Sequence, residues 1–270
     1  MCTRPVALSI AGFDPSSGAG ITADLKTFAA HRIYGVACIS ALTVQSTLGV
    51  RTIEPLSPNL VRETLDCLTE DITISGIKIG MLGDGAVAGE IAAFLARQSG
   101  KIDRRRIVLD PIVKSSSGAQ LIDANGIRIL RDKLLASVGW ITPNVQELAV
   151  LAGEGLPVPV AASRLVDMAA TQGNAELNVV VTGGDLDQPN DFLLGSSGEE
   201  SWFQGEKVVT SSTHGTGCAF SSALLCALIL GESPQQAVHS AKAYVTEGLR
   251  TAYPVGKGKG PINHLFRSEK

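Results

Sequence analysis

The sequence predicts an α/β fold in which helices cover both faces of a mostly parallel sheet. Short apolar segments alternate with helical segments along nearly the whole chain, which is the pattern of strands joined by helical crossovers. The strand-like segments are almost entirely apolar, as expected for strands buried on both faces. Hydrophobic residues make up 44% of the 270 residues, and a chain of this length can bury a large core. With no internal repeat, low-complexity tract or long linker, we expect a single domain over residues 1–270.

The first half of the chain alternates strands and helices in a regular order. Ile21, Leu25 and Phe28 recur at helical spacing, and Asp84 precedes another helical pattern as a capping residue would. The expected elements are strand Val6–Ile10, helix Ile21–His31, strand Val36–Leu42, a helix from Ser57 or Asn59 to about Glu70, strand Ile77–Ile79, helix Asp84–Gln98 and strand Ile107–Leu109.

The second half continues the alternation and ends in two long helices. Between Gly183 and Glu206 the chain is polar and rich in glycine, so we expect an edge hairpin or a lid there. The expected elements are helix Asn125–Ser137, strand Gly139–Ile141, helices Asn144–Leu151 and Pro159–Gln172, strand Asn178–Val181, a hairpin of Phe192–Leu194 with Ser201–Phe203, and helices Thr216–Leu230 and Pro234–Ala252.

Polar residues and glycines collect where the expected strands end. Ligands of open α/β folds bind beyond the carboxyl ends of the strands, so the sequence predicts a binding site at that edge. These residues are Gly12, Asp14, Ser16, Ser17, Gly18 and Gly20, then Thr43, Gln45 and Ser46, then Gly80, Met81 and Gly83, then Asp110 and Pro111, then Thr142, Asn144 and Glu147, and finally Thr182, Gly183 and Gly184.

The segment His214–Cys218 is the most informative of these sites. It is a small-residue turn that leads directly into an apolar helix, so backbone N–H groups without partners and the helix dipole favour an anion there, most plausibly a phosphate. We expect the same field to favour the thiolate of Cys218. The alternative is an ordinary glycine turn beside a buried, inert cysteine.

Composition excludes several classes of function. A net charge of −3 and an aromatic content of 4% provide no basic footprint and few stacking platforms, so we expect no nucleic-acid partner. The cysteine count is five, with no CxxC pair, which indicates free thiols in the cytoplasm. The longest apolar run, Cys218–Leu230, is too short to span a bilayer, and Val6–Gly12 is interpreted as a strand rather than a signal peptide.

Taken together, these motifs closely resemble the hydroxymethylpyrimidine/phosphomethylpyrimidine kinases of thiamine biosynthesis, which belong to the ribokinase-like superfamily. The resemblance runs nearly end to end and implies a ribokinase-like three-layer sandwich. The matching segments are Ile10–Ser16, Ala23–Phe28, Ala41–Gln45, Lys78–Gly83, Asp110–Pro111, Thr142–Asn144 with Glu147, His214–Cys218 and Gly258–His264.

The resemblance implies an ATP- and Mg²⁺-dependent cytoplasmic kinase, a homodimer, that acts on a small aminopyrimidine. The pyrimidine would meet Gln45 and a pocket lined by Gly12, Asp24 and Met81. The transferred γ-phosphoryl group would lie in the anion hole beside Cys218, which we interpret as a proton acceptor or orienting group. The implied site residues are Cys218, Gly215, Thr216 and Gly217 for catalysis, Gln45, Asp24, Gly12 and Met81 for the substrate, Thr182, Gly183 and Gly184 for ATP, and Asp110, Asn144 and Glu147 for the metal.

Alternatives remain open for several residues and for the function. Asn144 with Glu147 is close to a helix capping box, Asp24 could pair with Lys26 or cap a helix, and His214 could be structural. A pyridoxal kinase is the nearest enzymatic alternative, because both substrates are small aromatic rings that carry a hydroxymethyl group. A non-catalytic ligand-binding protein on a kinase fold is the alternative from another class, since a fold alone does not establish catalysis.

Overall fold

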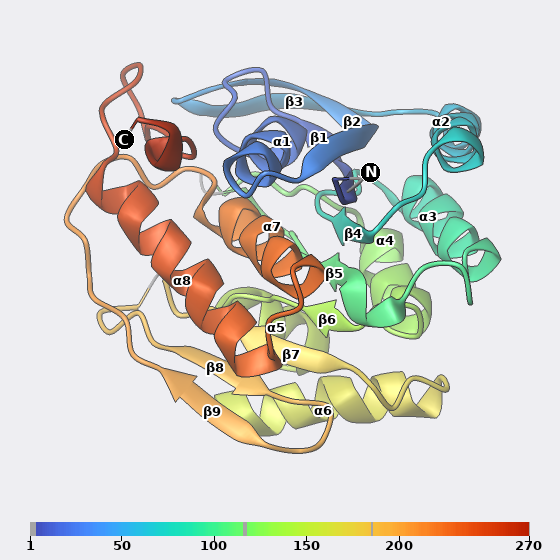
Figure 1. The fold of residues 1–270 in the computed structure, drawn as a ribbon. Helices are drawn as coiled ribbons and strands as arrows, with labels where there is room; N and C mark the ends of the chain where they lie inside the picture. The colour runs from blue at the N-terminus through green and yellow to red at the C-terminus, as the bar shows by residue number, and fades with distance from the viewer. Residues whose placement is uncertain (1–3, 116–117, 185, 270) are drawn as a thin grey trace.

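A computed structural model describes residues 4–115, 118–184 and 186–269. The described residues include a nine-stranded sheet of order β3-β2-β1-β4-β5-β6-β7-β8-β9 (Figure 1). The six strands from β2 to β7 in this order are parallel, whereas β3, β8 and β9 join by antiparallel pairing. The strands are β1 Val6–Phe13, β2 Tyr34–Ser46, β3 Gly49–Pro55, β4 Gly76–Ile79, β5 Ile107–Leu109, β6 Trp140–Ile141, β7 Asn178–Val181, β8 Asp191–Leu194 and β9 Glu200–Phe203.

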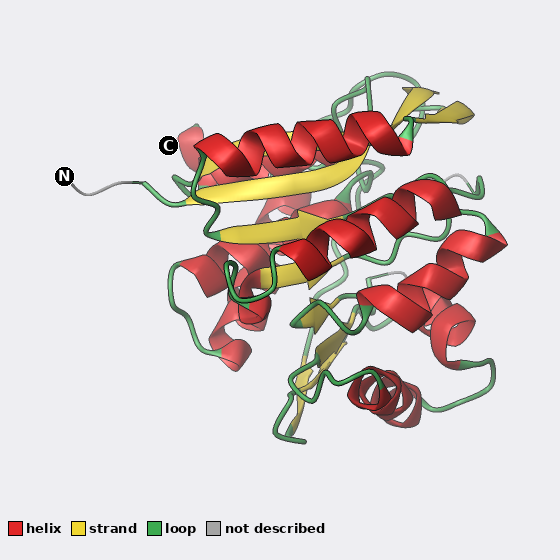
Figure 2. Ribbon diagram, turned by 90° about the vertical axis from the view of Figure 1, so that its right-hand side faces the viewer, coloured by secondary structure: helices red, strands yellow, loops and turns green. Residues whose placement is uncertain are grey.

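Helices cover both faces of this sheet and form the outer layers of a sandwich (Figures 1 and 2). The helices α1 Gly20–Ala30, α7 Thr216–Ile229 and α8 Pro234–Arg250 pack on one face, around Phe28, Leu224 and Tyr244. The other face is covered by α2 Pro58–Asp71, α3 Gly85–Arg97, α4 Ala124–Ile129, α5 Val145–Ala152 and α6 Val158–Thr171. Figure 2 views the sheet from the side of α2 and α3. The expected three-layer α/β architecture is therefore confirmed.

The two-residue period of the strands decides which layer each side chain enters. In β4, Ile77 and Ile79 join the core under α2 and α3, whereas Lys78 points to the layer of α1 and α7. Lys78 pairs in register with Ser9 of β1 and with Val108 of β5. A lysine thus lies fully buried between the sheet and the helices of this layer.

Capping residues set several helix starts, and Ser57 is one of the two caps that the sequence offered for its helix. The side chains of Ser57, Asp84 and Ser233 accept hydrogen bonds from backbone N–H groups in the first turns of α2, α3 and α8. The helix expected over Asn125–Ser137 instead begins at Ala124 and passes into a π-helical turn, Leu130–Leu134.

The main difference from the expected fold lies in the β2–β3 hairpin. Strand β2 continues beyond the end of β1 as far as Ser46, and a short turn returns it as β3, which the sequence analysis did not foresee. Thr43, Gln45 and Ser46 therefore belong to a strand rather than to the loop after it. The hairpin projects past the parallel sheet, so in this part β2 pairs with β3 and with no described strand of the parallel sheet.

None of the described helices combines the length and the apolar character that crossing a membrane requires.

Candidate active site

The carboxyl ends of the parallel strands bring most of the expected site residues to one edge. Backbone hydrogen bonds continue the ladder one residue beyond each strand, from Gly80 N to Ile10 O, from Asp110 N to Ile79 O and from Thr142 N to Leu109 O, at 2.8 to 2.9 Å. The residues that follow β4, β5 and β6 consequently begin at a common level of the sheet, beside Ile10 of β1.

Among the described residues, the turn before α7 leaves backbone N–H groups without backbone partners. Gly215 is the N-cap residue of α7, and no side chain that the structure describes caps this helix start. Its φ of +83° is a conformation that glycine adopts without strain. Ala219 N bonds to Gly215 O, the first hydrogen bond of the helix. Within the described part of the chain, the N–H groups of Thr216, Gly217 and Cys218 have no backbone partner. Three donors and the positive end of the helix dipole therefore converge on one point.

A buried ionic cluster lies beneath this turn. The Lys78 Nζ atom lies 3.0 Å from Asp24 Oδ1 and 3.8 Å from Asp110 Oδ2. Ser9 and Ser222 donate to Asp24 at 2.6 and 2.8 Å, and Ser221 donates to Asp110 at 3.0 Å. Burial opposes a charged ammonium, but the Asp24 carboxylate and the other nearby acidic groups raise the pKa of Lys78 above its usual range. Burial raises the pKa of the Asp110 carboxyl, although Lys78 opposes the shift.

This cluster corrects the expected role of Asp24. Its side chain is fully buried and both carboxylate oxygens are engaged by Lys78 and serines, so it lines no open pocket in this structure. It does not pair with Lys26 either, because the Lys26 ammonium donates to Ser17 O at 2.7 Å. Asp24 is instead the counter-ion of Lys78.

The expectation of a Cys218 thiolate is wrong. The side chain lies in the buried first turn of α7, and desolvation raises the pKa of its thiol to about 12, although Lys78 opposes the shift. The nearby carboxylates of Asp110 and Asp24 add to the increase. A helix N-terminus favours the thiolate, but here the loss of water around the thiol has the larger effect on its pKa.

Alkylation tests this correction. We expect iodoacetamide to modify exposed Cys67 at neutral pH, while Cys218 reacts slowly and accelerates about tenfold per pH unit from pH 6 to 9, in step with its thiolate fraction. Peptide mass spectrometry separates the two sites. A Cys218 rate that levels off near neutral pH would contradict the raised pKa.

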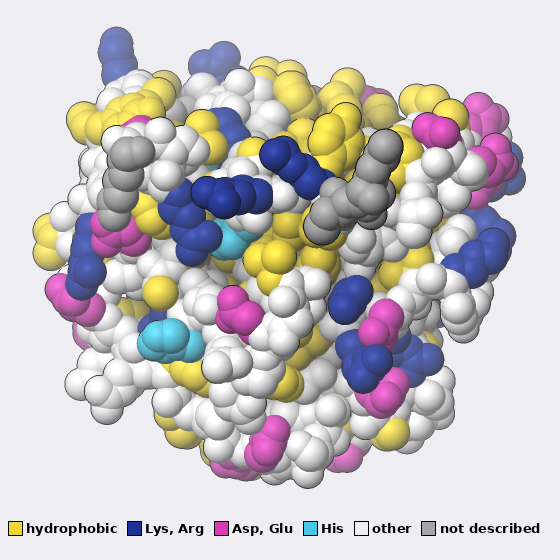
Figure 3. Space-filling view, viewed as in Figure 1, with side chains coloured by type: hydrophobic (Ala, Val, Ile, Leu, Met, Phe, Trp, Pro, Cys, Tyr) yellow, Lys and Arg dark blue, Asp and Glu magenta, His cyan; other side chains and the backbone are white. Residues whose placement is uncertain are grey.

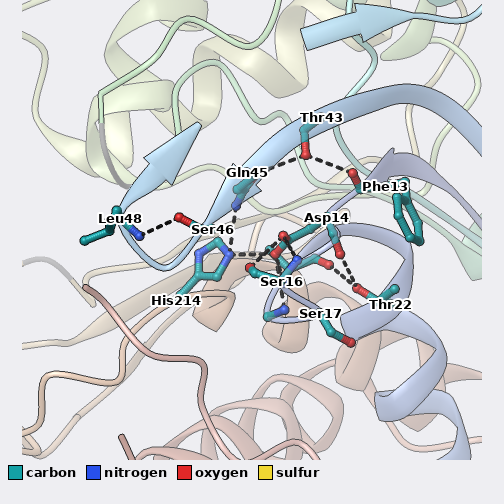
Figure 4. Close-up of polar contacts among 12 residues, drawn as sticks. Phe13, Asp14, Ser16, Ser17, Thr22, Thr43, Gln45, Ser46, Leu48 and His214 are labelled. Carbon is teal, nitrogen blue, oxygen red and sulfur yellow. Dashed lines mark hydrogen bonds and ion pairs between the residues drawn. The ribbon is translucent and has the colours of Figure 1, made fainter. Parts of the chain in front are cut away.

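Gln45, the candidate ring-binding residue, lies near the tip of the β2–β3 hairpin and faces His214 (Figure 4). Gln45 is half-buried, and its carboxamide lies 3.1 Å from Nε2 of His214 and 3.3 Å from Oγ1 of Thr43. Gly12 and Met81 are neighbours, since a Cβ on Gly12 would lie 2.9 Å from the Met81 sulfur. The hairpin thus brings Gln45 to the turn that begins α7, across 169 residues of sequence.

His214 is held in turn by Asp14. Its Nε2 atom lies 2.8 Å from Asp14 Oδ2, and Asp14 also accepts hydrogen bonds from Ser16, Gly18 and Ala19 at 2.7 to 3.2 Å. Burial alone would raise the pKa of Asp14, but the hydrogen bonds from His214 and Ser16 outweigh it and lower the pKa to about 2. Asp14 is therefore a carboxylate at neutral pH.

Asn144 and Glu147 form the capping box that the sequence left as an alternative. Asn144 Oδ1 accepts from Glu147 N at 2.8 Å, and Glu147 Oε2 accepts from Asn144 N at 2.9 Å. In residues 4–115, 118–184 and 186–269, no group of three or more His, Cys, Asp and Glu side chains is arranged to hold a metal.

The segment Thr182–Gly184 lies beside this capping box. Thr182 N donates to Pro143 O at 2.9 Å, and Thr182 forms a parallel bridge with Asn144. Gly183 N donates to Asp191 Oδ1 at 3.0 Å, and Asp191 pairs with Lys242 of α8 at 2.8 Å. These contacts place the expected ATP-phosphate residues next to the expected metal residues.

Three functional features escaped the sequence analysis. Lys78 had a detectable signal, because a charged residue inside the apolar strand Gly76–Ile79 requires a buried partner. The pairing of Asp14 with His214 had no local signal, since 200 residues separate them. The contacts of Gln45 depend on the pairing of β2 with β3, a strand that the sequence analysis did not predict.

Comparisons with known proteins agree on one family. The family model described as phosphomethylpyrimidine kinase matches residues 14–263. A hydroxymethylpyrimidine/phosphomethylpyrimidine kinase of Salmonella typhimurium is 39% identical over 96% of this chain and 97% of that protein. The thiamine biosynthesis bifunctional protein ThiED of Geobacter sulfurreducens is 35% identical over 98% of this chain, which spans 53% of that longer protein. The pyridoxal kinase of Staphylococcus aureus in complex with AMP-PCP and pyridoxal has a TM-score of 0.82 at 26% identity, over 97% of this chain and 94% of that one.

Proposed function

The chain belongs to the phosphomethylpyrimidine kinase family, and from this premise we propose how its residues perform the reaction. It is an ATP-dependent kinase of ribokinase-like fold that acts in thiamine biosynthesis. It phosphorylates the hydroxymethyl group of 4-amino-5-hydroxymethyl-2-methylpyrimidine and then converts the monophosphate to the diphosphate. The observation that carries the residue roles is His214, which links the candidate ring-binding residue Gln45 directly to the anion-binding turn.

The turn Gly215–Cys218 binds the transferred phosphoryl group in this proposal. Phosphoryl transfer depends mainly on positioning and on neutralising charge spread over the phosphoryl oxygens. The N–H groups of Thr216, Gly217 and Cys218 supply fixed donors for that charge. Cys218, protonated at neutral pH, orients the hydroxymethyl group rather than accepting its proton, and a loose transition state requires little help from a base.

ATP and Mg²⁺ occupy the neighbouring strand ends. The Thr182–Gly184 segment would contact the ATP phosphates, and Asp110 and the Asn144–Glu147 box would hold Mg²⁺ and its waters. Support comes from the adjacency of these groups at the ends of β5, β6 and β7. When bound, Mg²⁺ would neutralise phosphate charge, while the chain's own residues position the nucleotide.

Gln45 reads the pyrimidine ring, because a carboxamide offers both the donor and the acceptor that an amino group beside a ring nitrogen requires. We expect Gln45→Ala to raise KM for the hydroxymethylpyrimidine by about tenfold to a hundredfold, as for the loss of one or two hydrogen bonds to a ligand. The effect on kcat should be smaller, since the anion-binding turn is unchanged. An unchanged KM would show that the ring binds elsewhere.

A mass-spectrometric product assay tests the function as a whole. Purified protein with Mg·ATP is offered the hydroxymethylpyrimidine, its monophosphate, pyridoxal and ribose in parallel, and we expect conversion of the pyrimidine through to the diphosphate. Turnover of pyridoxal alone would favour the pyridoxal kinase alternative, which the likeness to the Staphylococcus aureus enzyme keeps in view. Pyrimidine binding without ATP turnover would favour a non-catalytic binding protein.

We further propose that residues 1–270 act as one kinase domain in a cytoplasmic homodimer. Leu42, Val44 and Leu48 of the β2–β3 hairpin are 43%, 57% and 66% exposed, an apolar face that a second copy could cover; sedimentation equilibrium would report the assembly mass.

The four cysteines in the described residues are free thiols. Acidic and basic side chains intermingle over much of the face in Figure 3, with a group of Lys and Arg side chains near α1, in keeping with a small-molecule substrate rather than nucleic acid.

A further inference from the structure

The carboxamide of Gln45 has a fixed direction that the hydrogen-bond network determines. His214 Nε2 faces both Asp14 Oδ2, at 2.8 Å, and the amide end of Gln45, at 3.1 Å (Figure 4). A ring nitrogen of neutral histidine either donates or accepts, but not both. Asp14 is ionised, because its pKa is lowered to about 2, and a carboxylate only accepts. His214 must therefore carry a proton on Nε2 and donate it.

The atom of Gln45 that faces this N–H must then be its oxygen. Amide oxygen and nitrogen have nearly the same shape, so the network decides which is which. The amide nitrogen consequently lies at the other end, 3.3 Å from Thr43 Oγ1. That hydroxyl gives its single hydrogen to Phe13 O at 2.9 Å and is free to accept one from Gln45. In this arrangement the Thr43 hydroxyl hydrogen goes to Phe13 O alone, and the Nε2 hydrogen of His214 is shared between Asp14 Oδ2 and the Gln45 oxygen as a three-centre bond.

Charging of His214 does not change this direction, since a protonated ring also donates from Nε2. Asp14 is itself immobilised by donors from Ser16, Gly18 and Ala19. The His214 ring packs against Gly18, where a Cβ would collide with it. Asp14 and the His214 ring are thus held in place, and only the Gln45 carboxamide can turn.

We propose that His214, oriented by Asp14, is a specificity-determining residue that fixes the polarity with which Gln45 meets a substrate ring. This inference rests on the proposed role of Gln45. A ring with an amino group beside an unprotonated nitrogen presents a donor and an acceptor in one order. The corresponding 4-oxo ring presents a carbonyl acceptor and a protonated nitrogen, in the reverse order. A carboxamide held in one direction cannot pair with both rings, whereas a carboxamide that turns freely can.

The test compares the kcat/KM of two probes, the 4-amino hydroxymethylpyrimidine and its 4-oxo analogue. We expect His214→Leu to reduce the amino-to-oxo preference by about tenfold, the value of about one hydrogen bond. His214→Gln should restore most of it, because the Asp14 carboxylate again selects a nitrogen donor. A structural role alone would lower kcat/KM for both probes equally, and an unchanged ratio in His214→Leu would overturn the inference.

The Gln45→Ala background separates the two levels of the argument. In that background His214→Leu should leave the amino-to-oxo ratio unaltered, because the residue through which it acts is gone. If Gln45→Ala alone does not alter the ratio, the proposed role of Gln45 fails. If it alters the ratio but His214→Leu does not, only the inference about His214 fails.

A measurement on the unaltered chain covers the case in which His214→Leu does not fold. Protein labelled with ¹⁵N-histidine should show His214 protonated at Nε2 around neutral pH, with the signal assigned by its loss in His214→Gln. A His214 ring protonated only at Nδ1 would overturn the proposal.

Discussion

Gly215→Ala should lower kcat by roughly 100-fold or more, as expected when an oxyanion donor is displaced. Gly215 has φ of +83°, and an added Cβ would overlap the carbonyl oxygen of Gly18. The turn must therefore shift, which moves the N–H groups of Thr216 and Gly217 away from the phosphoryl group. Steady-state kinetics with the hydroxymethylpyrimidine at saturating ATP would measure the loss.

Gly231→Ala is the matched control at the opposite end of the same helix. Gly231 also has a positive φ, +89°, but an added Cβ meets nothing within 4 Å. Both variants carry the conformational cost of a left-handed alanine, about 1 kcal/mol. We expect Gly231→Ala to lower the free energy of unfolding by this amount and to leave kcat unchanged. Equal kcat for the two variants would show that the turn is not the phosphoryl site.

Lys78→Met should be the most destabilising single substitution among those considered, by about 3–5 kcal/mol, because it leaves buried carboxylates without a cation. Urea unfolding followed by circular dichroism would measure the change. The loss should shrink as the pH falls, since burial raises the pKa of Asp110, and its carboxylate then takes up a proton. The Asp24→Asn/Lys78→Met double variant should recover a large part of the stability by removing both charges of the tighter pair.

The exposed ion pair of Lys207 and Asp187 is the matched control. Its atoms lie 2.9 Å apart, as close as in the buried pair, but its side chains are 60% and 103% exposed. Exposed pairs contribute little, so Lys207→Met should leave the unfolding midpoint unchanged. If Lys78→Met unfolded at the same urea concentration as Lys207→Met, the buried cluster would not support the fold as described.

The sequence predicted the strands and helices well where a periodic pattern was long. Strands Ile107–Leu109 and Asn178–Val181 have the expected bounds, and the starts of α2 and α3 follow from Ser57 and Asp84. The β2–β3 hairpin was missed because its strands pair with each other beyond the parallel sheet, and its inner face is only partly buried, where Val50 and Ile53 pack against a small apolar cluster.

For the candidate site, the sequence proposed which residues carry chemistry but could not give their contacts. The turn before α7 follows from its glycines and from helix geometry, and the structure places it as expected. The states of Asp24 and Cys218 depend on burial, and burial depends on which elements cover them. A lysine from β4 takes Asp24 out of the pocket, and loss of water raises the pKa of Cys218 to about 12.

The sequence by itself determined the α/β class, the family resemblance and the glycine turn before α7, because these depend on local backbone chemistry and residue order. Only the tertiary structure decided that Lys78 joins Asp24 and Asp110, and that Asp14 directs His214 toward Gln45. Hydrogen-bond direction and desolvation act between atoms a few ångströms apart, and here those atoms lie as many as 200 residues apart along the chain.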